Sequence, residues 1–106
     1  MIETVQINDI VNRIALNYNP DKIILFGSYA HGNYTDNSDL DFILVKDTNT
    51  PKHKRGLEVR RLFYGLPLSM DFKIYTSSEF INELSNQYSF LYSAIKGSKM
   101  VYERKD

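Results

Sequence analysis

The fold of this chain is decided by residues 22–45, which read KIILFGSYAHGNYTDNSDLDFILV. The two ends of this stretch, 22–26 and 39–45, are short apolar and β-branched runs, a pattern typical of buried strands. Between them, residues 27–32 predict a turn and a short helix, and residues 33–38 a polar loop. The stretch therefore predicts two strands whose connection begins with a glycine and a serine.

Helices are expected on both sides of this stretch. Apolar residues at helical spacing predict a first helix that ends just before Pro20, because proline disfavours helix in the residue that precedes it. The basic segment 52–64 predicts a helix with Leu57, Leu62 and Phe63 as its buried positions.

The last third of the chain predicts further alternating elements. Residues 68–75 alternate as a third strand, and Ser77 or Ser78 is the expected N-cap of the helix that follows. A short helix is expected at 89–96 and an edge strand at 100–102. Strands interleaved with helices predict an α/β fold (α+β in some schemes), with one small mixed sheet flanked by helices.

Length and composition limit the class of protein. With 106 residues, 42% hydrophobic and 25% charged, the chain is expected to form one globular domain, residues 1–106. The absence of cysteine excludes disulfides, thiolate zinc sites and a cysteine nucleophile. No apolar run is long enough to span a bilayer, and the first residues lack a signal-peptide pattern, so we expect no membrane association and a cytoplasmic location.

The zero net charge hides an asymmetry between the two halves. Residues 1–50 hold three Lys/Arg and seven Asp/Glu, whereas residues 51–106 hold ten and six, five of the cations lying within 52–61. This distribution suits a ligand that brings both metal ions and phosphates, although a solvated helix face explains the basic segment equally. Nucleic acid is not the expected partner, because the aromatic residues of that segment lie at its end and are typical of a core.

Three aspartates are candidates for metal binding and catalysis. Side chains alternate along a strand, so Asp39 and Asp41 share one face, and Asp71 occupies the middle of the third strand together with Lys73. If the two strands are neighbours, the three carboxylates converge on one open face, where Lys73 either supplies a cation for a substrate phosphate or forms a salt bridge with Asp71. Hard oxygen ligands suit Mg²⁺ or Mn²⁺, which bind together with substrate phosphates.

Gly27 and Ser28 are candidates for phosphate binding. Glycine permits close approach of the backbone to a ligand, N–H groups at a following helix start bind anions, and the serine hydroxyl can donate to a phosphate oxygen. For this pair alone a plain turn is the favoured explanation, and Asp-x-Asp is common in loops. The combination with Asp39, Asp41 and Asp71 is what favours a site of phosphoryl or nucleotidyl transfer.

This combination is similar to a known family. Gly27-Ser28, ten intervening residues and Asp39-Leu40-Asp41 resemble the G-S-x10-D-x-D signature of the DNA polymerase beta nucleotidyltransferase superfamily. The short chain, together with MDFKIYTSSEF at 70–80 and GSKMVYE at 97–103, resembles its minimal nucleotidyltransferase (MNT) branch. The resemblance spans residues 22–103 and implies a nucleotidyltransferase fold.

The resemblance also implies roles for individual residues. Asp39 and Asp41 would be metal ligands, Asp71 would help to bind metal and assist deprotonation of an acceptor hydroxyl, and Gly27 and Ser28 would hold the terminal phosphates of ATP. Two metal ions would stabilise the attacking oxygen and the leaving pyrophosphate.

His31 departs from the family pattern, which often has arginine at this position. A histidine of ordinary pKa is mostly neutral at pH 7 and is therefore a weaker phosphate partner. His31 is either a phosphate contact or a surface loop residue.

The expected reaction follows from the resemblance and the chain length. The superfamily core occupies nearly the whole chain and leaves no acceptor domain, so we expect a partner to supply the acceptor. MNT proteins are commonly antitoxins of helical HEPN ribonuclease toxins, which implies Mg²⁺-dependent transfer of AMP from ATP to a toxin tyrosine.

Two other functions remain open. One is a catalytically weak nucleotide-binding module that neutralises its partner by stoichiometric binding. The other is a nucleotidyltransferase for a small molecule, with its acceptor site formed across a homo-oligomer. The edge strand expected at 100–102 could pair with a second copy or with a partner.

Overall fold

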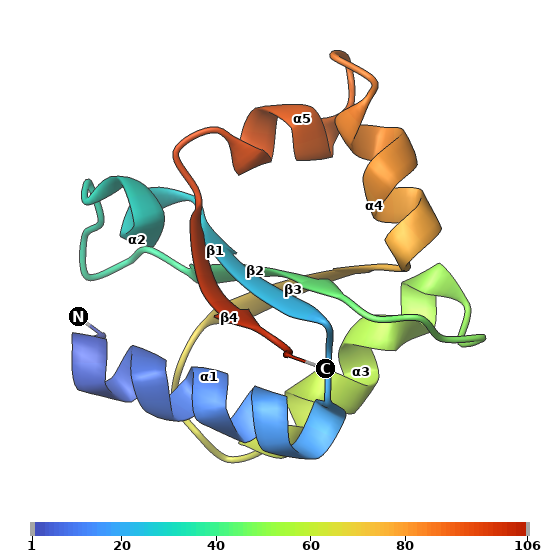
Figure 1. Ribbon diagram of the computed structural model, residues 1–106. Coiled ribbons are helices and arrows are strands. Elements are labelled where there is room, and N and C mark those ends of the chain that lie inside the picture. The colour runs from blue at the N-terminus through green and yellow to red at the C-terminus, as the bar shows by residue number, and fades with distance from the viewer. Residues whose placement is uncertain (1, 106) are drawn as a thin grey trace.

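The computed structural model describes residues 2–105, which form a four-stranded mixed sheet with helices on both faces (Figure 1). In chain order the elements are α1 (Thr4–Tyr18), β1 (Lys22–Phe26), α2 (Ser28–His31), β2 (Leu40–Val45), the 3-10 turn η1 (Lys52–Lys54), α3 (Arg55–Arg60), the 3-10 turn η2 (Arg61–Phe63), β3 (Met70–Tyr75), α4 (Ser77–Leu84), α5 (Phe90–Ile95) and β4 (Lys99–Glu103). The strand order is β3-β2-β1-β4. β1 is antiparallel to β2 and β4, whereas β2 and β3 are parallel.

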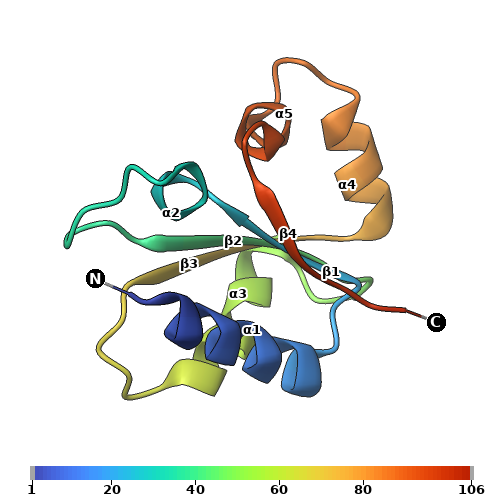
Figure 2. The same ribbon diagram turned by 60° about the vertical axis from the view of Figure 1, so that its left-hand side comes forward.

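Two layers of helix cover the sheet. α1 and α3 lie on one face, and α4 and α5 lie on the other (Figure 2). Because side chains alternate along a strand, Ile23 and Leu25 of β1 join the core beneath α1, whereas Ile24 and Phe26 join the core beneath α5. The central strands are therefore apolar on both faces, and the predicted α/β fold with one small mixed sheet is confirmed.

The first helix and the first strand are confirmed. α1 ends at Tyr18, with Asn19 as its C-cap in the left-handed region at φ 54°, a conformation that asparagine tolerates better than most residues. Pro20 then prevents the helix from continuing. β1 spans Lys22–Phe26, the predicted range, and β2 begins at Leu40, one residue later than predicted.

The predicted helix over 52–64 is confirmed as a helical segment over 52–63, whereas the prediction of Leu57 as one of its buried positions is wrong. The segment is two 3-10 turns around the six-residue α3, and the buried stripe consists of Arg55, Val59 and Phe63, spaced four residues apart. Leu57 lies on the opposite side and is 53% exposed, whereas Val59 is fully buried. The apolar pattern did not identify this buried stripe, because the first position of the stripe is an arginine.

The N-cap of α4 is Thr76, so the prediction of Ser77 or Ser78 is also wrong. The Thr76 hydroxyl accepts from the Glu79 amide at 3.3 Å, and the Glu79 carboxylate accepts from the Thr76 amide at 2.8 Å, which is a capping box. β3 ends at Tyr75, so the cap is the first residue after the strand.

The predicted edge strand is confirmed and slightly longer than expected. Among the residues that the structure describes, β4 pairs with β1 alone, with a register shift opposite Ile23 and Ile24. In residues 2–105, no helix combines the length and apolar composition that crossing a bilayer requires.

Candidate functional site

The candidate residues come together at one end of the sheet. Asp41 of β2 and Asp71 of β3 are register partners on parallel strands, and Asp41 is also the register partner of Phe26 on β1. Gly27 and Ser28 directly follow Phe26. The pairing of the second and third predicted strands, on which the hypothesis of a shared acidic site depended, is therefore confirmed.

Gly27 makes the closest approach to an aspartate. Its φ is +76°, which L side chains rarely adopt, and a Cβ built on it would lie 2.5 Å from Oδ2 of Asp41. The Gly27 carbonyl accepts from the amides of Ala30 and His31 at 3.1 Å each, which closes the short helix α2. Within residues 2–105, the Ser28 hydroxyl makes no hydrogen bond, so it is available to a ligand.

Asp39 lies immediately before β2 and is exposed. Its carboxylate accepts a hydrogen bond from the Ser69 hydroxyl, and the amide of Leu40 donates to the Ser69 carbonyl at 2.9 Å. Ser69 thus fixes Asp39 to the start of β3. No local pattern connects Ser69 with Asp39, because the two residues are 30 positions apart in the chain.

Two cations hold Asp71. Lys73 Nζ lies 3.4 Å from its Oδ2, and Arg60 lies 3.6 Å from its Oδ1. The ion pair with Lys73 is one of the two predicted alternatives. Arg60 belongs to the basic segment that the sequence singled out, but no spacing in the sequence connects α3 with β3, so its contact with Asp71 was missed.

The prediction that the acidic face is open is wrong in part. α4 and α5 cover the portion of this face formed by Ile43 and Tyr75. Phe90 of α5 contacts Phe26 edge to face, and Lys73 Nζ lies 5.2 Å from the centroid of the Phe90 ring. The three aspartates occupy the remaining end of the face, where Asp41 and Asp71 are half-buried.

The negative charge of the three aspartates at this end of the sheet favours a bound cation. Burial raises the pKa of Asp41, and the negative charges of Asp71 and then Asp39 raise it further, against the lowering effect of Lys73. A divalent cation would compensate this repulsion, and carboxylate oxygens are the ligands that Mg²⁺ and Mn²⁺ prefer. The donor set therefore fits such an ion, although in the described part of the chain no three acidic or histidine side chains already form a metal-binding group.

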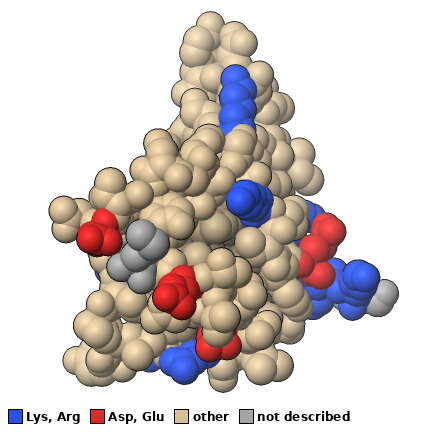
Figure 3. Space-filling view, turned by 90° about the vertical axis from the view of Figure 1, so that its left-hand side faces the viewer, with Lys and Arg blue, Asp and Glu red and all other residues tan. Residues whose placement is uncertain are grey.

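His31 lies at the exposed end of α2. A Cβ built on Gly97 would lie 2.8 Å from Nδ1 of His31, so the imidazole rests against the turn that leads into β4. Figure 3 shows the molecule from the side on which α2 lies, and uncharged residues form most of this face. The cations that contact the candidate site come from elsewhere, Arg60 from α3 and Lys73 from β3.

Comparisons with known proteins agree with this geometry. Residues 8–106 match the family described as "Polymerase beta, Nucleotidyltransferase". A protein of Methanocaldococcus jannaschii named "Putative protein adenylyltransferase" is 33% identical over 104 residues, which is 96% of this chain and all of that protein. A second protein of that organism with the same name is 53% identical over 38 residues, 35% of this chain and 38% of that protein.

The fold has a similar solved structure. The crystal structure of a putative nucleotidyltransferase from Sulfolobus solfataricus matches with a TM-score of 0.63 at 22% identity, covering 92% of this chain and 78% of that chain. Since the family match extends over almost the whole chain and a relative matches end to end, this chain belongs to the polymerase beta nucleotidyltransferase family of enzymes.

Proposed function

We propose that this chain is a Mg²⁺-dependent adenylyltransferase that transfers AMP from ATP to a hydroxyl of a partner protein. The expected partner is a helical HEPN-type toxin and the expected acceptor is a tyrosine, so the chain would act as an antitoxin. The observation that carries the proposal is the register pairing of Asp41 with Asp71 beside the Gly27 turn. The name of the full-length relative supports a protein as the acceptor.

Asp39 and Asp41 would hold Mg²⁺ or Mn²⁺, and Asp71 would complete the acidic site. The bound ion would neutralise phosphate charge and polarise the phosphoryl group under attack. The Gly27–Ser28 turn would bind the terminal phosphates, through backbone amides that glycine leaves accessible and through the Ser28 hydroxyl.

For the transfer, the protein then only has to position the two substrates and remove one proton from the acceptor hydroxyl. The acceptor oxygen attacks the α-phosphorus of ATP, the bond from that phosphorus to its bridging oxygen breaks, and pyrophosphate leaves. Asp71 accepts the hydroxyl proton as the new bond forms. Lys73 and Arg60, which contact the Asp71 carboxylate, orient it toward the acceptor.

A second candidate function is stoichiometric inhibition of the same partner. It is favoured by the two ion pairs of Asp71, which occupy the carboxylate that catalysis would use. In that case the fold would bind its partner and catalysis would be weak.

Intact-mass measurement separates the two functions. The purified chain is mixed with ATP, Mg²⁺ and the helical protein that is encoded beside its gene. The intact masses of both proteins are then measured by mass spectrometry. The enzyme hypothesis predicts that the partner gains the mass of AMP, and that Asp39→Asn combined with Asp41→Asn abolishes the gain. Asp9→Asn, an exposed change on α1, is the matched control. A stable complex without added mass would favour the inhibitor.

A further inference from the structure

A cleft of about 350 Å³ runs along the free edge of β3, next to the candidate site. It is lined by residues 72–75 of β3, by Lys52 and Gly56 from the helical segment before the strand, and by Phe90 of α5. β3 is the last strand of the sheet on this side, with α3 on one face and α4 and α5 on the other (Figures 1 and 2). The cleft therefore lies beside the edge of β3 that no other strand of residues 2–105 covers.

The backbone of β3 turns the amides of Phe72 and Ile74 toward this cleft. The Lys46 amide donates to the Tyr75 carbonyl at 2.9 Å, so Tyr75 turns its backbone toward β2. In a parallel ladder alternate residues face the same neighbour, so Phe72 and Ile74 turn their backbone groups outward. The Ile74 carbonyl confirms this direction, because it accepts from Arg55 of α3 at 3.3 Å. The outward amides of Phe72 and Ile74 are suited to an extended segment.

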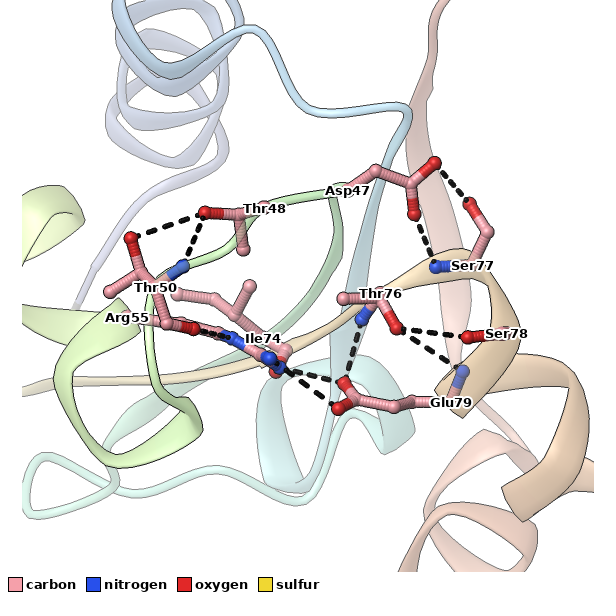
Figure 4. A network of polar contacts seen from close by, with 9 residues as sticks. All are labelled: Asp47, Thr48, Thr50, Arg55, Ile74, Thr76, Ser77, Ser78 and Glu79. Carbon is pink, nitrogen blue, oxygen red and sulfur yellow. Dashed lines mark hydrogen bonds and ion pairs between the residues drawn. The ribbon is translucent and has the colours of Figure 1, made fainter.

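The helical wall of the cleft is held in place by a buried arginine. Arg55 is 6% exposed, and its guanidinium donates to the carbonyls of Thr50 and Ile74 and to both carboxylate oxygens of Glu79 (Figure 4). Gly56, the next residue, brings α3 close to the strand, since a Cβ built on it would lie 3.6 Å from the Phe72 carbonyl oxygen. The cleft is thus part of the fixed fold.

Cations follow the cleft from end to end. Lys52 Nζ lies 4.8 Å from the centroid of the Tyr75 ring, at the end far from Asp71. Lys73 Nζ lies between the Phe90 ring and Asp71, and its side chain is 42% exposed. Two of the aromatic rings that line the cleft, those of Tyr75 and Phe90, are therefore faced by ammonium groups.

Arg60 continues this row of cations beyond Asp71. Its guanidinium lies 3.6 Å from the Asp71 carboxylate, and its side chain is 59% exposed. An acidic segment lying along β3 would therefore meet positive charge on both sides of Asp71.

We propose that this cleft docks an extended, acidic segment of the acceptor protein along β3, with the hydroxyl to be modified beside Asp71. The inference rests on the proposed function and adds to it how the acceptor is recognised. A polypeptide fits better than a nucleic acid strand for two reasons. The outward amides of β3 match an extended backbone, and the ammonium groups over Tyr75 and Phe90 occupy the ring faces on which bases would stack.

Peptide binding tests the docking independently of catalysis. Fluorescence anisotropy, without ATP, compares a short peptide that has a tyrosine between glutamates with the same peptide carrying lysines instead. We expect the acidic peptide to bind about tenfold more tightly at low salt, a difference that falls as salt rises. Lys52→Glu should weaken it by about fivefold or more, whereas Lys105→Glu, an exposed change in the segment after β4, should alter it less than about twofold.

A second variant tests the shape of the cleft. Gly56→Leu places a side chain in the cleft and removes no charge, so it should also weaken the acidic peptide while circular dichroism and unfolding remain those of a folded protein. Equal binding of the acidic and basic peptides, or equal effects of Lys52→Glu and Lys105→Glu, would overturn the proposal. Tighter binding of a single-stranded oligonucleotide, lost in Lys52→Glu, would also overturn it in favour of a nucleic acid.

The two proposals fail in different ways. If the acidic peptide binds through the cleft but gains no AMP with ATP and Mg²⁺, the docking surface stands and the proposed reaction fails. If the partner is adenylylated with the same KM by wild type and Lys52→Glu, the reaction stands and this docking surface is excluded.

Discussion

Asp41 lies directly against the Cα of Gly27, so close that a Cβ on Gly27 would lie 2.5 Å from Asp41 Oδ2. This contact joins the predicted phosphate-binding turn to the predicted metal ligand through adjacent, antiparallel strands. The two parts of the family signature, the glycine-serine turn and the aspartate pair, are separated in the sequence but are in contact in the fold.

Gly27→Ala should be more damaging than the matched change Gly32→Ala. Both glycines have positive φ, +76° and +82°, so each substitution carries a backbone cost of about 1–2 kcal/mol. A Cβ on Gly32 has nothing within 4 Å, whereas one on Gly27 collides with Asp41. Urea unfolding should therefore show a larger loss for Gly27→Ala, and nucleotidyl transfer should fall in that variant alone. Equal losses would contradict the importance of the close approach.

Asp41→Asn should stabilise the metal-free protein at pH 7 by less than about 1 kcal/mol, because solvent screens the charges around a half-buried carboxylate. Burial and the charges of Asp71 and Asp39 raise the pKa of Asp41, so its ionised form destabilises the fold at neutral pH, and an amide removes that repulsion.

Asp41→Asn should also lose the stabilisation that Mg²⁺ gives to the wild type, which is about 2.7 kcal/mol at a Mg²⁺ concentration of a hundred times the Kd. Thermal unfolding with and without Mg²⁺ measures both, with Asp9→Asn as the control. A less stable metal-free Asp41→Asn would contradict the expectation.

Glu79 should contribute to stability in a pH-dependent manner. Its hydrogen bonds with Arg55 and with the Thr76 amide lower its pKa from 4.5 to about 2. Because the folded-state pKa is depressed, this contribution is complete above about pH 4.5 and is lost as the pH falls toward 2.

Glu79→Gln isolates this contribution. At pH 7 it should cost about 1–3 kcal/mol, less than a fully buried pair because the Glu79 side chain is partly exposed. The difference from wild type should shrink on going from pH 7 to pH 3 in urea unfolding. Glu83→Gln, also on α4, is the matched control, and a difference independent of pH would refute the role of the ion pair.

Val59→Ala and Leu57→Ala should have very different effects although both lie on α3. Val59 is fully buried, so its truncation should cost about 1–3 kcal/mol, whereas Leu57 is 53% exposed and its truncation should lie within about 0.5 kcal/mol of wild type. Chemical denaturation measures both. A larger loss for Leu57→Ala would mean that this face of α3 is covered in solution.

Local patterns predicted the elements that are strongly periodic or strongly apolar. β1 was predicted at its observed bounds because Lys22–Phe26 is a run of residues that a buried central strand requires. α1 was predicted because its buried stripe is wholly apolar and ends before Pro20. Alternation also placed Asp71 and Lys73 together on the third strand, and the ion pair between them confirms this.

Local patterns failed where a polar side chain takes a buried position. Arg55 begins the buried stripe of α3 because Glu79 and two carbonyls satisfy its guanidinium, and these partners come from segments distant in the chain. The α4 cap was misplaced by one or two residues, although Thr76 and Glu79 carry the capping-box signature. The contact of Arg60 with Asp71 had no local signal at all.

The sequence by itself determined the central strands, the order of strands and helices, and the chemical types present at the candidate site, because alternation, helical spacing and the glycine-serine turn act over a few residues. Only the tertiary structure decided that β2 and β3 are parallel neighbours with Asp41 opposite Asp71, and that Lys73 and Arg60 hold Asp71. It also decided that the free edge of β3 borders a cationic cleft. These relationships depend on which strands pair and how the helices pack on them, since the groups that meet are separated by long stretches of chain and carry no short-range signal.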